Sequence, residues 1–235
     1  MGPPGYNGWD MARPFEHIKP TLRTWGQNRA RVLILPGAGQ GPGCWEPVGR
    51  ALAGRGLSAA CLEYPGHGEK PWPAPPFTNL RDYTLLAARA AAGLGRPILA
   101  GHDLGGLLVQ RLLGLADLPA LLLAPWPKAG LLYAAPSLGW NLLRGRPQEP
   151  GFGSEPWQLR MQAALGWPML QKGRAGGAPC LVAAPQKDPL IKPAGLAALA
   201  RTLHAGLVSL PESGHHLWKE PQVVLGLIAK LASMM

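Results

Sequence analysis

The stretch ILAGHDLGG, residues 98–106, decides how this chain folds. Its first three residues form an apolar run typical of a buried strand, and an apolar run with helical spacing begins at Leu104. Asp103 lies at the apex between them, with Gly101 two residues before it and Gly105 two residues after it. A sharp turn of this kind leaves no room for a Cβ on either side of its apex, which accounts for the glycines. We therefore expect the Asp103 side chain to project over the edge of a sheet, beside the N-terminus of a helix.

Strand-like and helix-like patterns alternate outward from this turn. Short apolar runs predict strands over residues 32–35, 57–62, 97–100, 120–123, 180–183 and 206–210. Helical spacing and end signals predict helices over residues 45–55, 80–94, 104–115, 193–203 and 221–234. Residues 1–30 are irregular and are expected to hold one or two edge strands. The alternation predicts an α/β fold with a mostly parallel, doubly wound sheet covered by helices on both faces.

Residues 126–178 interrupt this rhythm, because they are rich in Gly, Pro, Trp and Arg. A chain of 235 residues, 47% of them apolar, is long enough for one domain that carries an insertion. We therefore expect a core made of residues 1–125 and 179–235, with residues 126–178 inserted between two of its strands.

The charge of the chain gives little support to a nucleic-acid partner. The formal net charge of +10 comes from 23 basic and 13 acidic residues. The closest basic residues, such as Arg29 with Arg31 and Arg144 with Arg146, never form a run. Nucleic-acid-binding proteins usually gather their bases on one face or in a tail. We expect a small-molecule substrate as the partner, while the sequence leaves the oligomeric state open.

The remaining composition predicts a cytoplasmic protein. The sequence has no apolar run of about 18 residues that would cross a membrane, and residues 1–10 lack the basic-then-apolar pattern of a signal peptide. Cys44, Cys61 and Cys180 are scattered and odd in number, which favours neither a disulfide framework nor a zinc site. No metal is expected.

Two further polar side chains follow predicted strands. Asp188 comes soon after the strand at 180–183, and His215 follows the strand at 206–210. Ligands of such sheets bind at the carboxyl ends of the strands, so these side chains are expected to lie near Asp103. Histidine suits a general base near neutral pH, and a carboxylate can orient its ring. His216 is the alternative base, but Gly214 lets the loop turn the ring of His215 inward.

Each of the carboxylates also has a simpler interpretation. Asp103 could only cap the following helix, and Asp188 could only be a turn residue before Pro189. The pattern of glycines around Asp103 and the three separate strand ends favour the functional interpretation.

The loop after the first predicted strand contributes backbone groups. Residues 36–41 read PGAGQG, and the N–H of Ala38 together with the N–H of Leu104 could face a developing oxyanion. The glycines of residues 37–43 also suggest a dinucleotide fingerprint. Trp45 lies where the helix would approach phosphates, however, and Glu63 is the nearest acid to the ribose-reading position. No cofactor is therefore expected.

The order Asp103, Asp188, His215 is the order of nucleophile, acid and histidine in α/β-hydrolase-fold proteins, and the chain resembles that superfamily over residues 30–233. Residues 35–45 resemble the oxyanion loop of small esterases and hydroxynitrile lyases, with Pro36 where those usually have His. Residues 64–69 resemble the family's loop after the next strand. The resemblance implies that residues 126–178 are a cap domain.

Aspartate at the elbow, where most of the superfamily has serine, resembles epoxide hydrolases and haloalkane dehalogenases. The resemblance implies that Asp103 forms an ester with the substrate and that His215, oriented by Asp188, activates the water that hydrolyses it. The halide-binding positions of dehalogenases hold Leu104 and Ala38 here, which favours the epoxide-hydrolase comparison.

Aromatic side chains are the candidates for binding a small, largely apolar substrate. They are Trp45, Trp126 and Tyr133, and Tyr133 is also the one tyrosine of the insertion, where epoxide hydrolases place two as acids.

Two other interpretations stay open. The chain could be an esterase or thioesterase relative in which Asp103 replaces serine, acting as a weak hydrolase or as a base in lyase or cyclase chemistry. It could also be a non-catalytic, ligand-binding member of the fold.

Overall fold

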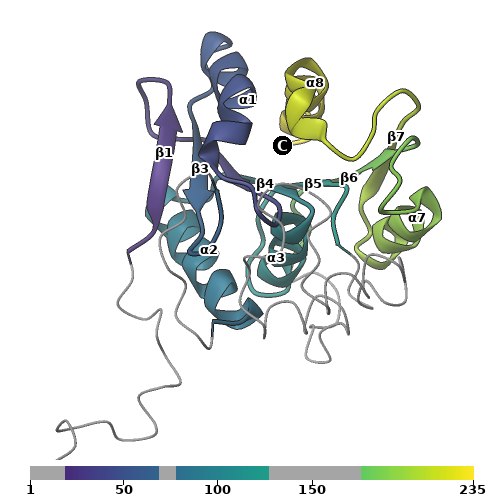
Figure 1. The fold of residues 1–235 in the computed structure, drawn as a ribbon, viewed down its shortest axis with the longest axis horizontal. Helices are drawn as coiled ribbons and strands as arrows, with labels where there is room; N and C mark the ends of the chain where they lie inside the picture. The colour runs from purple at the N-terminus through teal and green to yellow at the C-terminus, as the bar shows by residue number, and fades with distance from the viewer. Residues whose placement is uncertain (1–18, 69–77, 127–175) are drawn as a thin grey trace, which may run out of the picture.

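One sheet organises the described part of the chain. The computed structural model describes residues 19–68, 78–126 and 176–235. Their strands follow the order β1-β3-β2-β4-β5-β6-β7 across a seven-stranded sheet (Figure 1). Strand β1 pairs antiparallel with β3, and every other pair is parallel. The strands span Thr21–Trp25 (β1), Val32–Leu35 (β2), Ala59–Glu63 (β3), Ile98–His102 (β4), Ala120–Leu123 (β5), Cys180–Pro185 (β6) and Gly206–Leu210 (β7).

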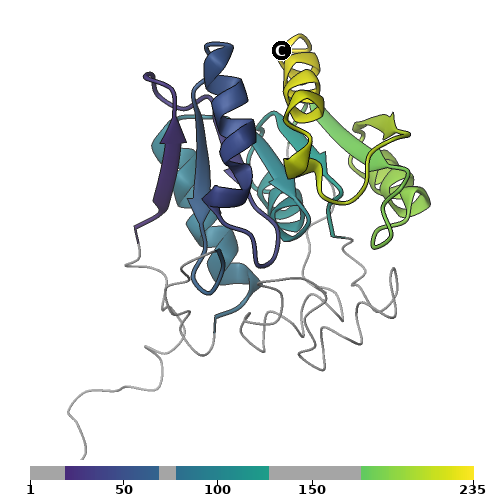
Figure 2. The same cartoon turned by 45° about the horizontal axis from the view of Figure 1, so that its top comes forward.

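Helices cover both faces of the sheet. Helices α1 (Pro42–Gly54) and α8 (Pro221–Ala232) lie side by side on one face, as Figures 1 and 2 both show. Helices α2 (Leu80–Leu94), α3 (Leu104–Leu113) and α7 (Pro193–Thr202) lie on the other face. A short 3₁₀ turn, η2 (Leu217–Lys219), precedes α8.

Alternation along the strands produces two hydrophobic cores. Leu33 and Leu35 of β2 pack with the α2, α3 and α7 side, whereas Val32 and Ile34 pack with the α1 and α8 side. Successive side chains of a strand point to opposite faces, so an uninterrupted apolar run is needed where both faces are covered. The four residues of β2 are all fully buried for this reason.

The predicted fold class is confirmed, with small shifts at the element ends. Helix α1 begins at Pro42, three residues before the predicted start, because proline suits the first helical turn. Strand β3 begins at Ala59, since the N–H of Leu57 still closes the end of α1 on Leu52. Asn79 caps α2 as expected, within a reciprocal capping box that includes Asp82. The expected edge strand within residues 1–30 is β1.

The expected division into core and insertion remains a prediction. The strands and helices come from residues 21–123 and 180–232, and most of the predicted insertion, residues 127–175, lies outside the described residues.

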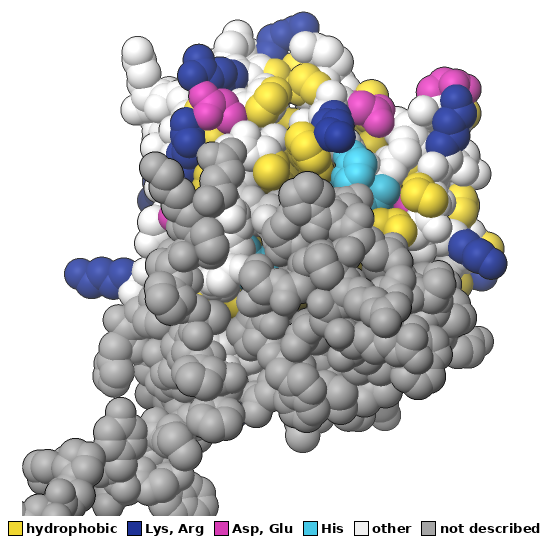
Figure 3. Space-filling model, in the orientation of Figure 1, with side chains coloured by type: hydrophobic (Ala, Val, Ile, Leu, Met, Phe, Trp, Pro, Cys, Tyr) yellow, Lys and Arg dark blue, Asp and Glu magenta, His cyan; other side chains and the backbone are white. Residues whose placement is uncertain are grey.

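Basic side chains are dispersed over the visible described surface. On the face seen in Figure 3, lysine and arginine side chains are scattered rather than gathered in one patch. Of the helices in the described ranges, none has the length and hydropathy needed to cross a membrane.

The turn from β4 into α3 is packed directly against its neighbours. A Cβ on Gly105 would lie 1.9 Å from the backbone oxygen of Leu35, and one on Gly101 would lie 2.5 Å from the oxygen of Gly105. Both obstacles are backbone atoms, so no side chain can move aside to make room. The glycines therefore let α3 start against the end of β2.

Replacing Gly105 by alanine is expected to destabilise the protein by about 3 kcal/mol or more, because overpacking against backbone cannot relax. Gly226→Ala in α8 is the matched control, since a Cβ there meets no atom within 4 Å. Alanine should stabilise that exposed helical position by up to about 1 kcal/mol. Urea unfolding midpoints measure both changes, and equal midpoints for the two variants would contradict the packing described for Gly105.

Candidate active site

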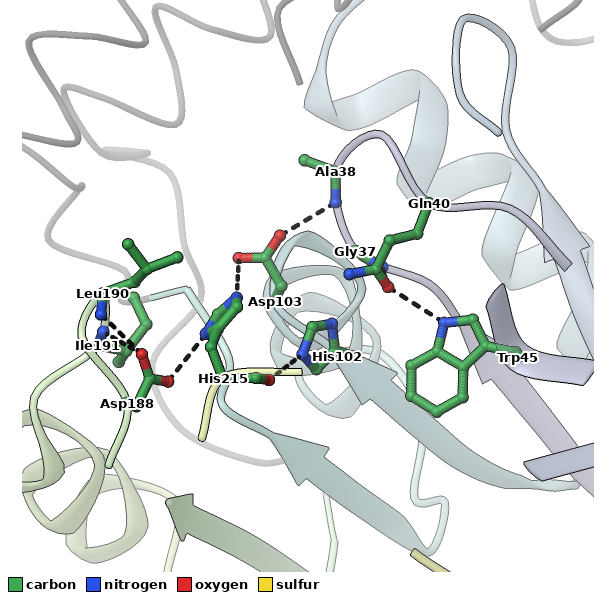
Figure 4. Close-up of polar contacts among 10 residues, drawn as sticks. All are labelled: Gly37, Ala38, Gln40, Trp45, His102, Asp103, Asp188, Leu190, Ile191 and His215. Atoms are coloured by element: carbon green, nitrogen blue, oxygen red, sulfur yellow. Dashed lines mark hydrogen bonds and ion pairs between the residues drawn. The ribbon is translucent and has the colours of Figure 1, made fainter. Parts of the chain in front are cut away.

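Three strands deliver the three predicted side chains to one edge of the sheet. Asp103 directly follows β4, Asp188 lies three residues after β6, and His215 follows β7. All three side chains are buried. Figure 4 shows the imidazole of His215 between the two carboxyl groups. The structure therefore brings together the residues that the sequence singled out as a triad.

Asp103 occupies a strained backbone conformation. Its φ is 51° and its ψ is −115°, in a region that residues other than glycine rarely adopt. Its side chain makes no capping hydrogen bond to α3, although it precedes the first residue of that helix. The capping interpretation therefore does not explain why an aspartate stands at this position.

The two carboxylate oxygens of Asp103 have different surroundings. Oδ2 accepts a hydrogen bond of 3.0 Å from the N–H of Ala38, and the backbone amide of Leu104 also favours the ionised form of this carboxyl group by lowering its pKa. Oδ1 lies 3.8 Å from Nε2 of His215. The amide of Ala38, which the sequence predicted as an oxyanion donor, is thus engaged by the carboxyl group itself.

Asp188 fixes the orientation of the histidine. Its Oδ2 lies 2.8 Å from Nδ1 of His215. Its Oδ1 accepts hydrogen bonds from the N–H groups of Leu190 (2.7 Å) and Ile191 (2.9 Å). A carboxylate held by two backbone donors keeps its remaining oxygen directed at the ring, so Nε2 of His215 is directed toward Asp103.

Burial makes the acid–base behaviour of Asp103 unusual. Loss of solvent is the largest influence on its carboxyl group and raises its pKa to about 7. His215 and the amides of Ala38 and Leu104 oppose this rise in pKa, whereas the nearby Asp188 adds to it. The carboxyl group therefore changes between its neutral and ionised forms near neutral pH.

The loop after β2 holds three successive N–H groups on three different acceptors. Gly37 donates to Oε1 of Gln40 (3.0 Å), Ala38 donates to Asp103, and Gly39 donates to Nδ1 of His67 (2.8 Å). A phosphate would need these amides free, which is a physical reason against the dinucleotide interpretation of the same glycines.

Sequence reasoning gave no role to three side chains that support this arrangement. They are Gln40, His67 and His102. Nε2 of His102 lies 2.8 Å from the backbone oxygen of His215. A carbonyl only accepts, so Nε2 of His102 carries a proton, and burial lowers the pKa of His102 well below its ordinary value. The one available signal was position, since His102 and Gln40 both lie beside predicted site residues.

Two of the three aromatic residues expected to bind substrate are buried, and the third is not among the described residues. Trp45 is fully buried in the core between the sheet and α1, and its Nε1 donates to Oε1 of Gln40 (3.1 Å). It supports the loop rather than facing a ligand, because an amphipathic indole in a core satisfies its N–H locally. Trp126 is also buried, and its backbone N–H donates to the backbone oxygen of Asp103. Tyr133 lies outside the described residues.

The described residues contain no cluster of three or more His, Cys, Asp or Glu side chains that could hold a metal ion. Their chemistry is that of a buried carboxyl group, an oriented imidazole and directed amides.

Replacing Asp103 by asparagine should remove a pH-dependent loss of stability. Between the ordinary aspartate pKa of 3.8 and about 7, the folded protein binds more protons at this site than the unfolded chain, so its stability falls as pH rises. The stability of Asp103→Asn relative to the parent should therefore increase by about 3 kcal/mol from pH 5 to pH 8. Urea unfolding at both pH values measures this difference. A difference that is constant with pH would contradict the raised pKa.

Known proteins share parts of this sequence and most of this fold. Esterase Rv0045c of Mycobacterium tuberculosis is 32% identical over 94 residues, which are 39% of this chain and 30% of that protein. The probable esterase PIR7A of Oryza sativa subsp. indica is 40% identical over 78 residues, which are 32% of this chain and 30% of that protein. Each match thus spans less than a third of the relative's length.

A solved structure shows the same architecture over a longer stretch. The haloalkane dehalogenase DbeA of Bradyrhizobium elkani superposes with a TM-score of 0.69, covering 91% of this chain and 95% of the other, at 18% sequence identity. A likeness at that identity concerns the fold alone. The model of the alpha/beta hydrolase family matches residues 32–227, which include every strand but β1 as well as Asp103, Asp188 and His215, and the chain therefore belongs to the alpha/beta hydrolase family.

Proposed function

We propose that this chain hydrolyses a small, largely apolar epoxide through the triad Asp103, His215 and Asp188, with Asp103 as the nucleophile. The observation that carries the proposal is the unequal environment of the two Asp103 oxygens. Oδ2 is held by the backbone amide of Ala38, while Oδ1 has the imidazole of His215 at 3.8 Å.

That asymmetry suits a carboxylate that forms an ester and then loses it. In the first step, Oδ1 attacks a saturated ring carbon, the carbon–oxygen bond of the epoxide breaks, and the ring oxygen takes the electron pair and a proton from an acid. Tyr133 is the sequence-based candidate for this acid. The product is an ester between Asp103 and the opened substrate, for which the carboxyl group must first be ionised.

The second step uses the other members of the triad. Nε2 of His215 takes a proton from water, and the water oxygen bonds to the carboxyl carbon of Asp103. The negative charge that develops on Oδ2 is stabilised by the amide of Ala38, which already donates to that atom, with the amide of Leu104 as the expected second donor. The ester bond then breaks, the imidazolium returns the proton to the leaving oxygen, and a diol is released.

The occupied oxyanion hole argues against direct attack on an ordinary ester. In serine-type hydrolysis, the carbonyl oxygen of the substrate enters the hole, but here Oδ2 of Asp103 fills it. A carboxylate that attacked an ester would also form an anhydride, which is a poor intermediate.

A second candidate is supported by the two relatives named as esterases. In this alternative the scaffold is that of an esterase in which aspartate has replaced serine, and Asp103 acts weakly or as a base. In that case the aspartate at position 103 occupies an oxyanion hole that would otherwise admit the carbonyl oxygen of a substrate.

The variant His215→Gln tests the proposed two-step reaction. It should still form the ester with a probe such as styrene oxide but hydrolyse it at least a hundredfold more slowly, because water lacks its base. Intact-protein mass spectrometry should then detect one added substrate mass on Asp103. His216→Gln is the matched control and should accumulate no adduct.

The origin of the diol oxygen gives an independent readout of the same reaction. In a single turnover in heavy-oxygen water, the first diol should contain no solvent label, because its new oxygen comes from Asp103. Solvent label in that first diol would reject Asp103 as the nucleophile. Absence of both adduct and turnover would favour a ligand-binding protein.

Asp103→Ser tests the second candidate. If the scaffold is that of an esterase, this variant should hydrolyse an aryl acetate at least a hundredfold faster than Asp103→Ala, because serine supplies a nucleophile and both variants empty the hole. Comparison of initial rates at equal folded fraction checks this, and equal rates for the two variants would exclude the esterase alternative.

A further inference from the structure

A histidine outside the triad touches the loop that carries the oxyanion donor. His67 lies in the turn after β3, and its side chain is buried. Its Nδ1 accepts the hydrogen bond of 2.8 Å from the N–H of Gly39, the residue after Ala38. A second bond joins the same two loops, from the N–H of Gly68 to the backbone oxygen of Gly39 (3.2 Å).

The direction of this bond defines the tautomer of His67. An N–H donates, so Nδ1 must be unprotonated and the ring proton must reside on Nε2. Burial lowers the pKa of His67 to about 4, so the ring is neutral at physiological pH. Nε2 has no hydrogen-bond partner among the described residues. The geometry thus shows a ring whose one satisfied polar contact is with the oxyanion loop.

Two clamped peptides enclose the peptide that donates to Asp103. The N–H of Gly37 is held by Gln40, whose Oε1 is itself fixed by the indole of Trp45. The N–H of Gly39 is held by His67. The Gly37–Ala38 peptide between them therefore has restricted freedom to rotate about its flanking bonds, and its N–H stays directed at Oδ2 of Asp103.

We propose that His67 is a positioning residue, which fixes the Ala38 N–H in the oxyanion hole by accepting the hydrogen bond of Gly39. This inference rests on the proposed function for its kinetic consequence. The Ala38 donor matters most when charge develops on Oδ2, during hydrolysis of the ester. It contributes little to ester formation, in which the carboxylate loses charge.

Three variants separate this role from a general structural one. His67→Leu removes the acceptor and should slow ester hydrolysis about tenfold to a hundredfold, while ester formation changes less than threefold. The ester should therefore accumulate during turnover of styrene oxide although His215 is intact. His67→Asn can place an amide oxygen near the position of Nδ1 and should restore most of the hydrolysis rate.

Tyr64→Phe is the packing control. The ring of Tyr64 meets the ring of His67 edge-on at 5.7 Å, and its hydroxyl has no partner among the described residues. This variant should leave both steps unchanged. Equal slowing of both steps by His67→Leu, or failure of His67→Asn to differ from it, would overturn the positioning role.

An activity-independent measurement distinguishes failure of this inference from failure of the proposed reaction. Nitrogen-15 spectra of labelled histidine should show His67 as the Nε2–H tautomer, and amide exchange at Gly39 should accelerate in His67→Leu but less in His67→Asn. The Nδ1–H tautomer would refute the inference even if the ester forms. If no ester ever forms but these signals hold, only the reaction is wrong.

Discussion

The hydrogen bond from the Ala38 amide to Asp103 depends on the close approach of two neighbouring strand ends. Strands β2 and β4 are adjacent and parallel, with Leu35 paired to Gly101, so the loop after one strand meets the turn after the other. A Cβ on Gly37 would lie 2.9 Å from the side chain of Asp103, and the start of α3 is tighter still at Gly105, where the corresponding distance to Leu35 is 1.9 Å. The hydrogen bond from Ala38 to Asp103 therefore depends on the same close packing that joins β2, β4 and α3.

The features that suit Asp103 to chemistry also make it unfavourable for stability. Asp103 combines a positive φ with a carboxyl group that burial makes reluctant to ionise. Both features lower the free energy of unfolding, and the packing of the apolar core must offset that loss. The fully buried strands on both sides of β4 contribute to that core, and Asp103, Asp188 and His215 follow three different strands whose positions the core fixes.

Much of this could be predicted from the sequence because the central strands carry uninterrupted apolar runs and the polar side chains lie in the turns and loops just after strands. Asp103, Asp188 and His215 were each found by their place after a strand. The role of His67 could not be found in this way, because its partner Gly39 lies 28 residues away and only the folded loops bring them together. Trp45 was misjudged for a related reason, since an aromatic side chain next to a functional loop can face either the pocket or the core. The side of the helix that it occupies is decided by tertiary packing.

The hydrogen bond from the Ala38 amide to Oδ2 of Asp103 has a practical consequence for how such a protein is detected. Reagents that phosphonylate a serine hydroxyl meet a carboxylate at this turn, and the Ala38 amide already donates its hydrogen bond to Oδ2. A proteome survey based on that labelling chemistry would pass over this chain even where it is abundant and folded. Alkylating electrophiles are the class of reagent that matches a carboxylate side chain at this position.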